Sequence, residues 1–143
     1  MTNASFIDRL SEPRAGNDLA MLREGLRRDI EALLNTRRRL LTTPSELEAL
    51  EGSLLDYGLD DFSLESHHSE EFREEFIDRV EHLVRRFEPR IGRFAVTVQH
   101  DAENLERTLR FRITGVVTLG DMPQELQFDS HVDPVRKLFV LQS

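Results

Sequence analysis

The spacing of apolar residues changes once along this chain, at Gly92, and that change limits the folds open to it. Before Gly92 apolar residues recur every three or four positions, which is typical of amphipathic helices. After Gly92 they alternate with polar residues, which is typical of strands with one buried face. Because the helices come first and the strands follow directly, the pattern predicts an α+β domain. Its N-terminal helices should pack on a small antiparallel β-meander of three to four strands.

Three helices are predicted before the change of spacing. The first begins at Asp18 and ends near Asn35, a residue that tolerates the left-handed conformation at a helix end. The segment Thr43-Pro44-Ser45-Glu46 has the pattern of a capping box and predicts a short second helix. The third follows Ser69, a suitable N-cap, and should end near Phe87 because Pro89 disfavours helical geometry at the residue before it.

The alternating part of the chain predicts strands over residues 94–99, 105–114, 126–132 and, more briefly, 138–141. Gly115 is expected to mark a bulge or a bend. The segment Gly120-Asp121-Met122-Pro123 is expected to form the next turn. A meander of this kind leaves strand edges that a monomer must protect or use.

The size of the chain fits one domain. With 143 residues, 38% of them hydrophobic, one ordinary core can close. Residues 1–17 are polar and lack a sustained period, so we expect a flexible N-terminal arm followed by a single domain over residues 18–143. The N-terminus has no secretory pattern and no apolar run approaches the ~20 residues that span a bilayer. These features predict a cytoplasmic protein without direct membrane insertion.

The charge balance disfavours nucleic acid as a partner. The formal net charge is -8, whereas nucleic-acid binding draws most of its affinity from neutralised phosphates. Of the 19 basic residues only Lys137 is a lysine. Arginine suits ion pairs between subunits because its planar fork pairs bidentately with carboxylates. A GC-rich genome would produce the same bias, and composition does not decide between the two explanations.

A positive cluster nevertheless follows the first helix. Arg37, Arg38 and Arg39 are adjacent, and positive charge at that position complements the helix dipole. Three neighbouring side chains cannot all face the body of the protein, so at least one should meet solvent or a partner. We predict partner contacts for all three residues; the alternative is a solvated loop.

The tripeptide Glu88-Pro89-Arg90 joins the third helix to the first strand. If the chain stays extended there, the side chains of Glu88 and Arg90 project to the same side and present an anion beside a cation. Such a rigid corner can form a charge-paired clasp with another chain. The alternative, which the tripeptide alone favours, is an intramolecular salt bridge at an ordinary helix end.

Catalysis and metal binding find little support. Of the five histidines, His82 is the one that shares a helix face with several acids, and that face lies opposite the apolar stripe, where hydration is the usual role. Glycoside hydrolysis needs two opposed carboxyl groups, one of them kept protonated. Glu88 is the only acid in a suitably apolar setting, and Arg90 favours its charged form. Cysteine is absent. No catalytic residue, metal or cofactor is predicted.

Three segments together resemble a known family: residues 28–38, whose core is Leu33-Leu34-Asn35-Thr36-Arg37, then Tyr57-Gly58-Leu59, and then Glu88-Pro89-Arg90. In this order and spacing, and with two strands after them, they resemble the baseplate wedge proteins of contractile phage tails. The similarity is greatest to the TssE family of type VI secretion systems. It extends over nearly the whole chain and is weaker before Asp18 and after Asp133.

The resemblance implies a non-enzymatic structural subunit, located in the cytoplasm at a baseplate docked to the inner membrane. It implies docking to the contractile sheath and seeding of its polymerisation, through sheet-edge and charge-pair contacts. Glu88, Pro89 and Arg90 correspond to the family motif that contacts neighbouring chains. The implied partners are the baseplate subunits TssF, TssG and TssK and the sheath proteins TssB and TssC. Because some members have been labelled lysozyme-like, the alternative is a peptidoglycan-degrading enzyme.

Overall fold

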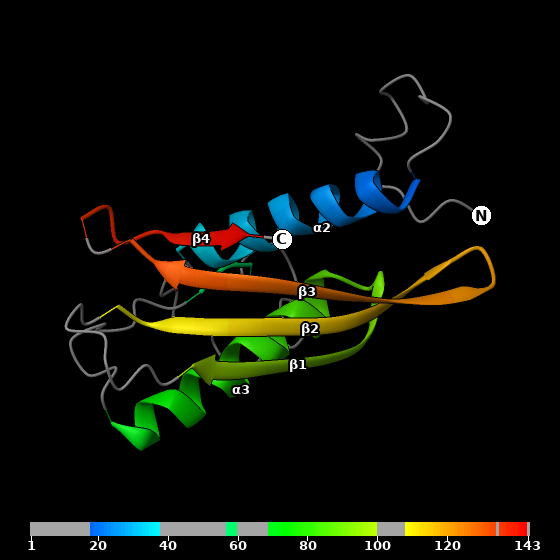
Figure 1. The fold of residues 1–143 in the computed structure, drawn as a ribbon. Helices are drawn as coiled ribbons and strands as arrows, with labels where there is room; N and C mark the ends of the chain where they lie inside the picture. The colour runs from blue at the N-terminus through cyan, green and yellow to red at the C-terminus, as the bar shows by residue number, and fades with distance from the viewer. Residues whose placement is uncertain (1–17, 38–56, 60–68, 100–107, 134, 143) are drawn as a thin grey trace, which may run out of the picture.

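The computed structural model describes residues 18–37, 57–59, 69–99, 108–133 and 135–142 and has the predicted α+β architecture (Figure 1). Its elements are α2 (Asp18–Asn35), α3 (Glu70–Phe87), β1 (Ile91–Gln99), β2 (Arg110–Leu119), β3 (Met122–Val132) and β4 (Phe139–Gln142). The strands form one antiparallel sheet in the order β1-β2-β3-β4. The predicted N-terminal arm and the capping box at residues 43–46 lie outside the described residues.

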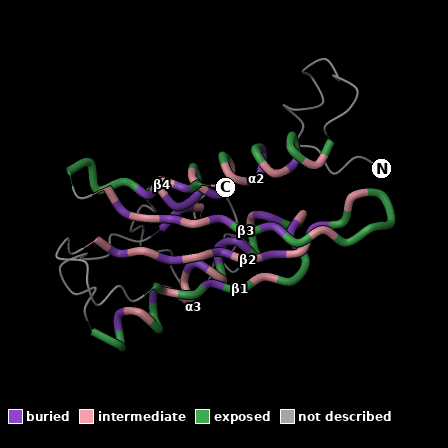
Figure 2. Tube along the Cα trace, in the orientation of Figure 1, coloured by how far each residue is buried: buried purple, intermediate pink, exposed green. Residues whose placement is uncertain are grey.

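One face of the sheet is buried and the other is polar. Along β2 and β3 buried residues alternate with partly exposed ones, as Figure 2 shows. The polar face carries an ion pair across these strands, in which Arg112 Nε donates to Asp129 Oδ1 at 2.6 Å. This pair, and above all its hydrogen bond, lowers the pKa of Asp129 below its ordinary value. The helices contribute apolar stripes to the buried side, which confirms the predicted layering.

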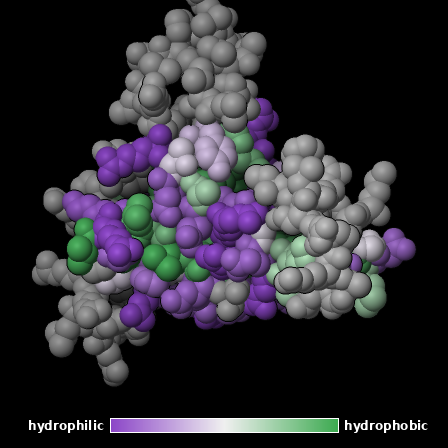
Figure 3. Space-filling view, turned by 90° about the horizontal axis from the view of Figure 1, so that it is seen from above, coloured by the Kyte–Doolittle hydropathy of each residue, from purple (hydrophilic) through white to green (hydrophobic). Residues whose placement is uncertain are grey.

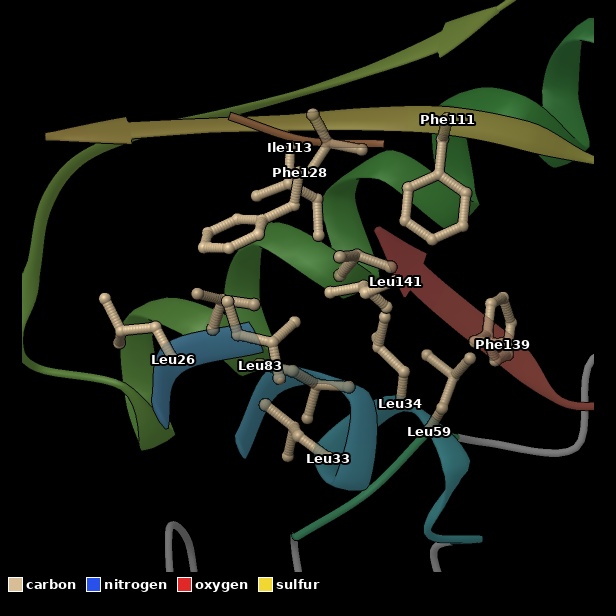
Figure 4. Close-up of a cluster of buried hydrophobic side chains, with 14 of the residues drawn as sticks. Leu26, Leu33, Leu34, Leu59, Leu83, Phe111, Ile113, Phe128, Phe139 and Leu141 are labelled. Carbon is tan, nitrogen blue, oxygen red and sulfur yellow. The ribbon is translucent and has the colours of Figure 1, made fainter. Parts of the chain in front are cut away.

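Three phenylalanine rings link α3 to two strands at the centre of the core. Phe76 of α3 meets Phe111 of β2 edge-on, with 5.1 Å between ring centroids, and stacks on Phe139 of β4 at 6.0 Å. Such aromatic pairs contribute beyond the area that they bury. Figure 4 shows further side chains from α2, α3 and the sheet pointing toward one another in the same core, among them Leu26, Leu33 and Leu83.

The ends of α3 follow from the residues predicted to set them. Ser69 is the N-cap, and its Oγ accepts the Phe72 N–H at 3.1 Å. The helix stops at Phe87, because Glu88 before the proline leaves the helical region, with φ -126° and ψ 73°. Both predicted boundaries are confirmed.

The second strand differs from its prediction. β2 runs past the predicted end at residue 114 and continues through Gly115 to Leu119. The register of β1 against β2 shifts between Ile91 and Phe94, and Phe94 is the residue that pairs with Gly115, so an irregularity lies where a bulge or bend was predicted. A Cβ at Gly115 would lie 2.6 Å from Cγ2 of Ile91, so glycine is needed where the irregular start of β1 crosses close to β2. Met122 and Pro123 were expected in the turn but belong to β3. The turn itself is Gly120-Asp121, with Gly120 at φ 62°.

Candidate functional site

The residues of the Glu88-Pro89-Arg90 corner form a compact ion cluster with α2. The guanidinium of Arg90 donates to both carboxylate oxygens of Glu88, from Nε at 2.5 Å and from Nη2 at 2.6 Å. Nη2 also donates to Asp29 Oδ2 of α2 at 2.5 Å. One arginine therefore holds two carboxylates, one bidentately, and ties the α3–β1 corner to α2.

This cluster is largely withdrawn from water. The side chain of Glu88 is 7% exposed and that of Arg90 15%, whereas Asp29 keeps 32%. The hydrogen bond with Glu88, and after it the contacts with Asp29, raise the pKa of Arg90 above its ordinary value despite burial. The intramolecular pairing considered as the alternative is thus confirmed. Contact of this corner with another chain stays a prediction, and Pro89 is its exposed member.

The second segment of the resemblance, Tyr57-Gly58-Leu59, packs beside the same cluster. The ring of Tyr57 meets Phe87 edge-on at 5.1 Å. Burial, and then the negative charges of Asp29 and Glu88, raise the pKa of the Tyr57 hydroxyl. The segments 28–37, 57–59 and 88–90, distant in sequence, therefore converge at one place in the fold.

The backbone fastens two of these segments together. The Leu59 N–H donates to the Thr36 carbonyl at 2.8 Å, and Arg37 forms a parallel bridge with Leu59. This pairing places Arg37 at the surface just beyond α2, with an exposed side chain, as the prediction of a solvent- or partner-facing cation requires. Arg38 and Arg39 lie outside the described residues, so their predicted contacts stay predictions.

The edge of the sheet at β4 is closed by side chains of α2. The amide of Asn35 donates from Nδ2 to the Phe139 carbonyl and accepts the Phe139 N–H at Oδ1, both at 2.8 Å. Glu31 Oε2 accepts the Leu141 N–H at 3.0 Å, and Arg27 Nη1 donates to the Leu141 carbonyl at 3.2 Å. α2 ends at Asn35, as predicted. The left-handed conformation offered as the reason is not adopted, because Asn35 has no positive φ and its side chain binds β4.

At the opposite edge, β1, the described residues supply fewer side-chain contacts to the backbone. There the Val96 N–H donates to Glu81 Oε1 of α3 at 3.3 Å. Glu81 also pairs with Arg85 at 3.3 Å, one helical turn further along α3. The two edges of the sheet thus differ in how completely side chains satisfy their outward backbone groups.

Viewed from the α2 side, the described surface is mostly hydrophilic, with hydrophobic side chains gathered over β4 and the turn before it (Figure 3). Val135 and Leu138 of that turn are among the exposed large hydrophobic residues. Within the described ranges no group of three acidic, histidine or cysteine side chains could hold a metal ion. Neither α2 nor α3 combines the length and hydropathy needed to cross a membrane.

The fold and the cluster define a small α+β protein with an internally braced helix–strand corner and two unlike sheet edges. The family described as "Baseplate wedge protein gp25" matches residues 20–121 of the 143, a range that contains all three converging segments. The chain therefore belongs to the baseplate wedge protein family, which confirms the resemblance read from its motifs.

A solved structure supports the fold. One chain of "The baseplate complex from the type VI secretion system" is similar to this protein with a TM-score of 0.54 and 18% sequence identity. The similarity covers 80% of this chain and 96% of that chain. At this identity the likeness establishes the shared fold alone. A comparison with curated proteins gave no match.

Proposed function

We propose that the protein is the TssE-like structural subunit of a type VI secretion baseplate, and that it docks to and seeds the contractile sheath. The family match over residues 20–121 carries the proposal. The likeness to a chain of a type VI secretion baseplate complex favours a secretion apparatus over a phage tail. The expected neighbours are TssF, TssG and TssK in the baseplate and TssB and TssC in the sheath, met in the cytoplasm at the inner membrane.

The ion cluster suits a part that must keep its shape in an assembly. Arg90 joins α2, α3 and β1 through two carboxylates, so the three elements cannot shift without breaking a desolvated pair. A preformed surface loses less conformational entropy on association. We assign the contacts with neighbours to the exposed Pro89 and the rims of Glu88 and Arg90, to Arg37, Arg38 and Arg39, and to a sheet edge.

The alternative, a peptidoglycan-degrading enzyme, fits the cluster less well. A general acid must hold a proton, whereas both oxygens of Glu88 accept hydrogen bonds from a guanidinium. The two hypotheses separate in one assay. The purified enzyme would clear a peptidoglycan suspension; a baseplate subunit would leave it turbid and copurify with sheath and baseplate proteins.

The decisive experiment is deletion of the gene in the native cell, followed by complementation and a count of extended sheaths carrying a fluorescent label. We expect the deletion to abolish sheaths and the wild-type chain to restore them. Normal sheath numbers in the deletion strain would refute a role in sheath seeding. A tagged chain isolated from the same cells and analysed by mass spectrometry identifies its neighbours directly.

A further inference from the structure

We propose that the turn between β3 and β4, residues 135–138, is a docking surface that inserts into an apolar pocket bordered by carboxylates on another protein subunit. This inference rests on the proposed function, because the partner is sought among the neighbours of a baseplate subunit. The turn lies outside the Glu88-Pro89-Arg90 corner and outside the hydrogen-bonding edges of the sheet. It combines a fixed backbone, exposed apolar side chains and positive charge, and these properties together define the partner.

The backbone of the turn is fixed by hydrogen bonds with Asp133. Oδ1 of Asp133 accepts the N–H groups of Val135 and Arg136, at 2.8 and 2.9 Å. The Asp133 carbonyl accepts the Lys137 N–H, and the Asp133 N–H donates to the Leu138 carbonyl, both at 2.8 Å. Each of the residues 135–138 is therefore bonded to Asp133, and the turn has its shape before a partner arrives. Association then costs less conformational entropy than it would for a floppy loop.

Two branched aliphatic side chains project from this fixed backbone. The exposed fraction is 88% for Val135 and 43% for Leu138, although Val132 and Phe139 on the flanking strands are buried. Figure 3 shows hydrophobic side chains gathered here on a surface that is otherwise mostly hydrophilic. Single exposed apolar residues are ordinary, but two of them held in one short turn form a patch that a partner can bury.

Positive charge lies between the two aliphatic residues. Arg136 and Lys137 are exposed, and the carboxylate of Asp133 at the base of the turn is directed to backbone N–H groups. Lys137 has φ 54°, a left-handed conformation that glycine or asparagine adopts at lower cost. A long charged side chain at such a position indicates that the side chain itself is used.

A further cation, Arg37, lies at the same end of the sheet. Glu31 of α2 binds the backbone of Leu141. Asn35, one helical turn later, binds the backbone of Phe139, so α2 runs along β4 toward the turn. Arg37 follows two residues after Asn35, and its side chain is exposed. Cations thus gather beside the apolar patch of a chain whose net charge is -8.

These properties identify the partner as a protein surface. Its pocket would receive Val135 and Leu138, and its aspartate or glutamate side chains would face Arg136 and Lys137. An anionic membrane is the competing partner, but headgroup binding relies on clusters of about 4–8 cations, and the net charge of -8 opposes it. The same net charge disfavours nucleic acid.

The contact can be tested chemically at Lys137, because it is the only lysine of the chain. A carbodiimide joins an amine to a carboxylate without a spacer, so only groups in contact are coupled. In baseplate–sheath assemblies isolated from the native cell, we expect Lys137 to be joined to an aspartate or glutamate of another subunit, located by mass spectrometry. Lys137→Arg is the control, which should lose the link and keep normal sheath numbers. A link to a second copy of this chain, or no link, would overturn the proposal.

A charge reversal tests the apolar part of the patch. Val135→Glu places an anion against the expected carboxylates, and Met122→Glu is the matched control at a side chain that is 66% exposed at the start of β3. Both full-length variants are expressed in the deletion strain, and both should melt like the wild type because each site is exposed. We expect Val135→Glu to lower the sheath number and the Lys137 link at least tenfold, and Met122→Glu to leave both near wild type.

Equal sheath numbers in the two variants would overturn the docking turn and leave the proposed function standing. A lowered melting temperature of Val135→Glu would show that Val135 packs within its own chain, which also refutes the proposal. Cosedimentation of the wild-type chain with phosphatidylglycerol vesicles, lost in Val135→Glu, would assign the turn to a membrane instead. Failure of the proposed function would look different, because the deletion itself would then leave sheath numbers unchanged.

Discussion

The outward backbone N–H and carbonyl groups of an edge strand need hydrogen-bond partners, and the two edges of this sheet differ in how the described residues provide them. At β4 three side chains of α2 make four hydrogen bonds of 2.8 to 3.2 Å to the outward backbone. At β1, within the part of the chain that the structure describes, a carboxylate of α3 makes one bond of 3.3 Å to the outward backbone. The comparison shows that a helix can satisfy the outward backbone N–H and carbonyl groups of an edge strand as a neighbouring strand does. This requires amide or charged side chains once per helical turn.

The largest expected effect on stability comes from a truncation in the core beneath β4. Phe76→Ala removes the ring that contacts both Phe111 and Phe139 and leaves a cavity between α3 and the sheet. We expect a loss of about 3 to 5 kcal/mol in the free energy of unfolding, measured by urea denaturation. Phe76→Leu, which keeps most of the volume, should lose less than half as much. An unchanged midpoint would show that this ring is not in the core.

The corner that anchors β1 should be nearly as sensitive. Arg90→Ala leaves the buried carboxylate of Glu88 without its bidentate partner. We expect a loss of about 3 kcal/mol, at the lower end for a buried pair because Asp29 keeps contact with water. Arg90→Lys preserves the positive charge but not the forked guanidinium. Its free energy of unfolding should lie between those of the wild type and Arg90→Ala. If Arg90→Ala melts like wild type yet abolishes sheaths, the corner serves a neighbouring chain and not the fold.

The β4 edge itself can be opened from outside. Asn35→Ala leaves the Phe139 N–H and carbonyl without protein partners, and we expect a loss of about 1 to 2 kcal/mol. Because the edge is then free to pair, the variant should also self-associate with rising concentration in sedimentation velocity. Asn35→Asp, which keeps the acceptor and loses the donor, is the matched control. A monodisperse Asn35→Ala variant would show that α2 shields the edge by bulk and not by hydrogen bonding.

Sequence patterns were sufficient to predict local features of this fold and insufficient to predict its long-range contacts. The bounds of α2 and α3 and the pairing of Glu88 with Arg90 involve neighbours in the chain, so periodicity, caps and a proline were enough to predict them. Asp29 lies 61 residues from Arg90, and Asn35 lies 104 residues from Phe139. No local pattern encodes such partners, because many acids and amides are chemically equivalent until the fold selects one. The need for glycine at position 115 has the same origin, because it comes from the approach of Ile91 across the sheet.

Tyr57 offers a spectroscopic probe of the charged corner. It is the only tyrosine and the chain has no tryptophan, so phenolate absorbance reports this residue alone. Its pKa is raised by burial and by the charges of Asp29 and Glu88. The folded protein therefore holds this proton more tightly than the unfolded chain. The stability due to the neutral hydroxyl is present below pH ~10 and is lost as pH rises through the folded pKa.

A pH titration tests the direction of the shift in the Tyr57 pKa. Absorbance should show Tyr57 ionising at higher pH in the native protein than in urea, and Tyr57→Phe should flatten the alkaline fall in stability. Arg90→Ala should raise the pKa of Tyr57 further, since it removes the cation that offsets both carboxylates. A Tyr57 pKa equal to that of the unfolded chain would show that the ring lies outside the field of the cluster.

The smallest effect is expected at the β1 edge, and it is the sharpest test of the comparison. Glu81→Ala removes the described side chain that accepts the Val96 N–H, yet this bond is long, and water can replace the carboxylate at an edge. We expect a loss of no more than about 0.5 kcal/mol in thermal or urea unfolding. A loss as large as that of Asn35→Ala would mean that α3 closes β1 as firmly as α2 closes β4, and the asymmetry between the edges would disappear.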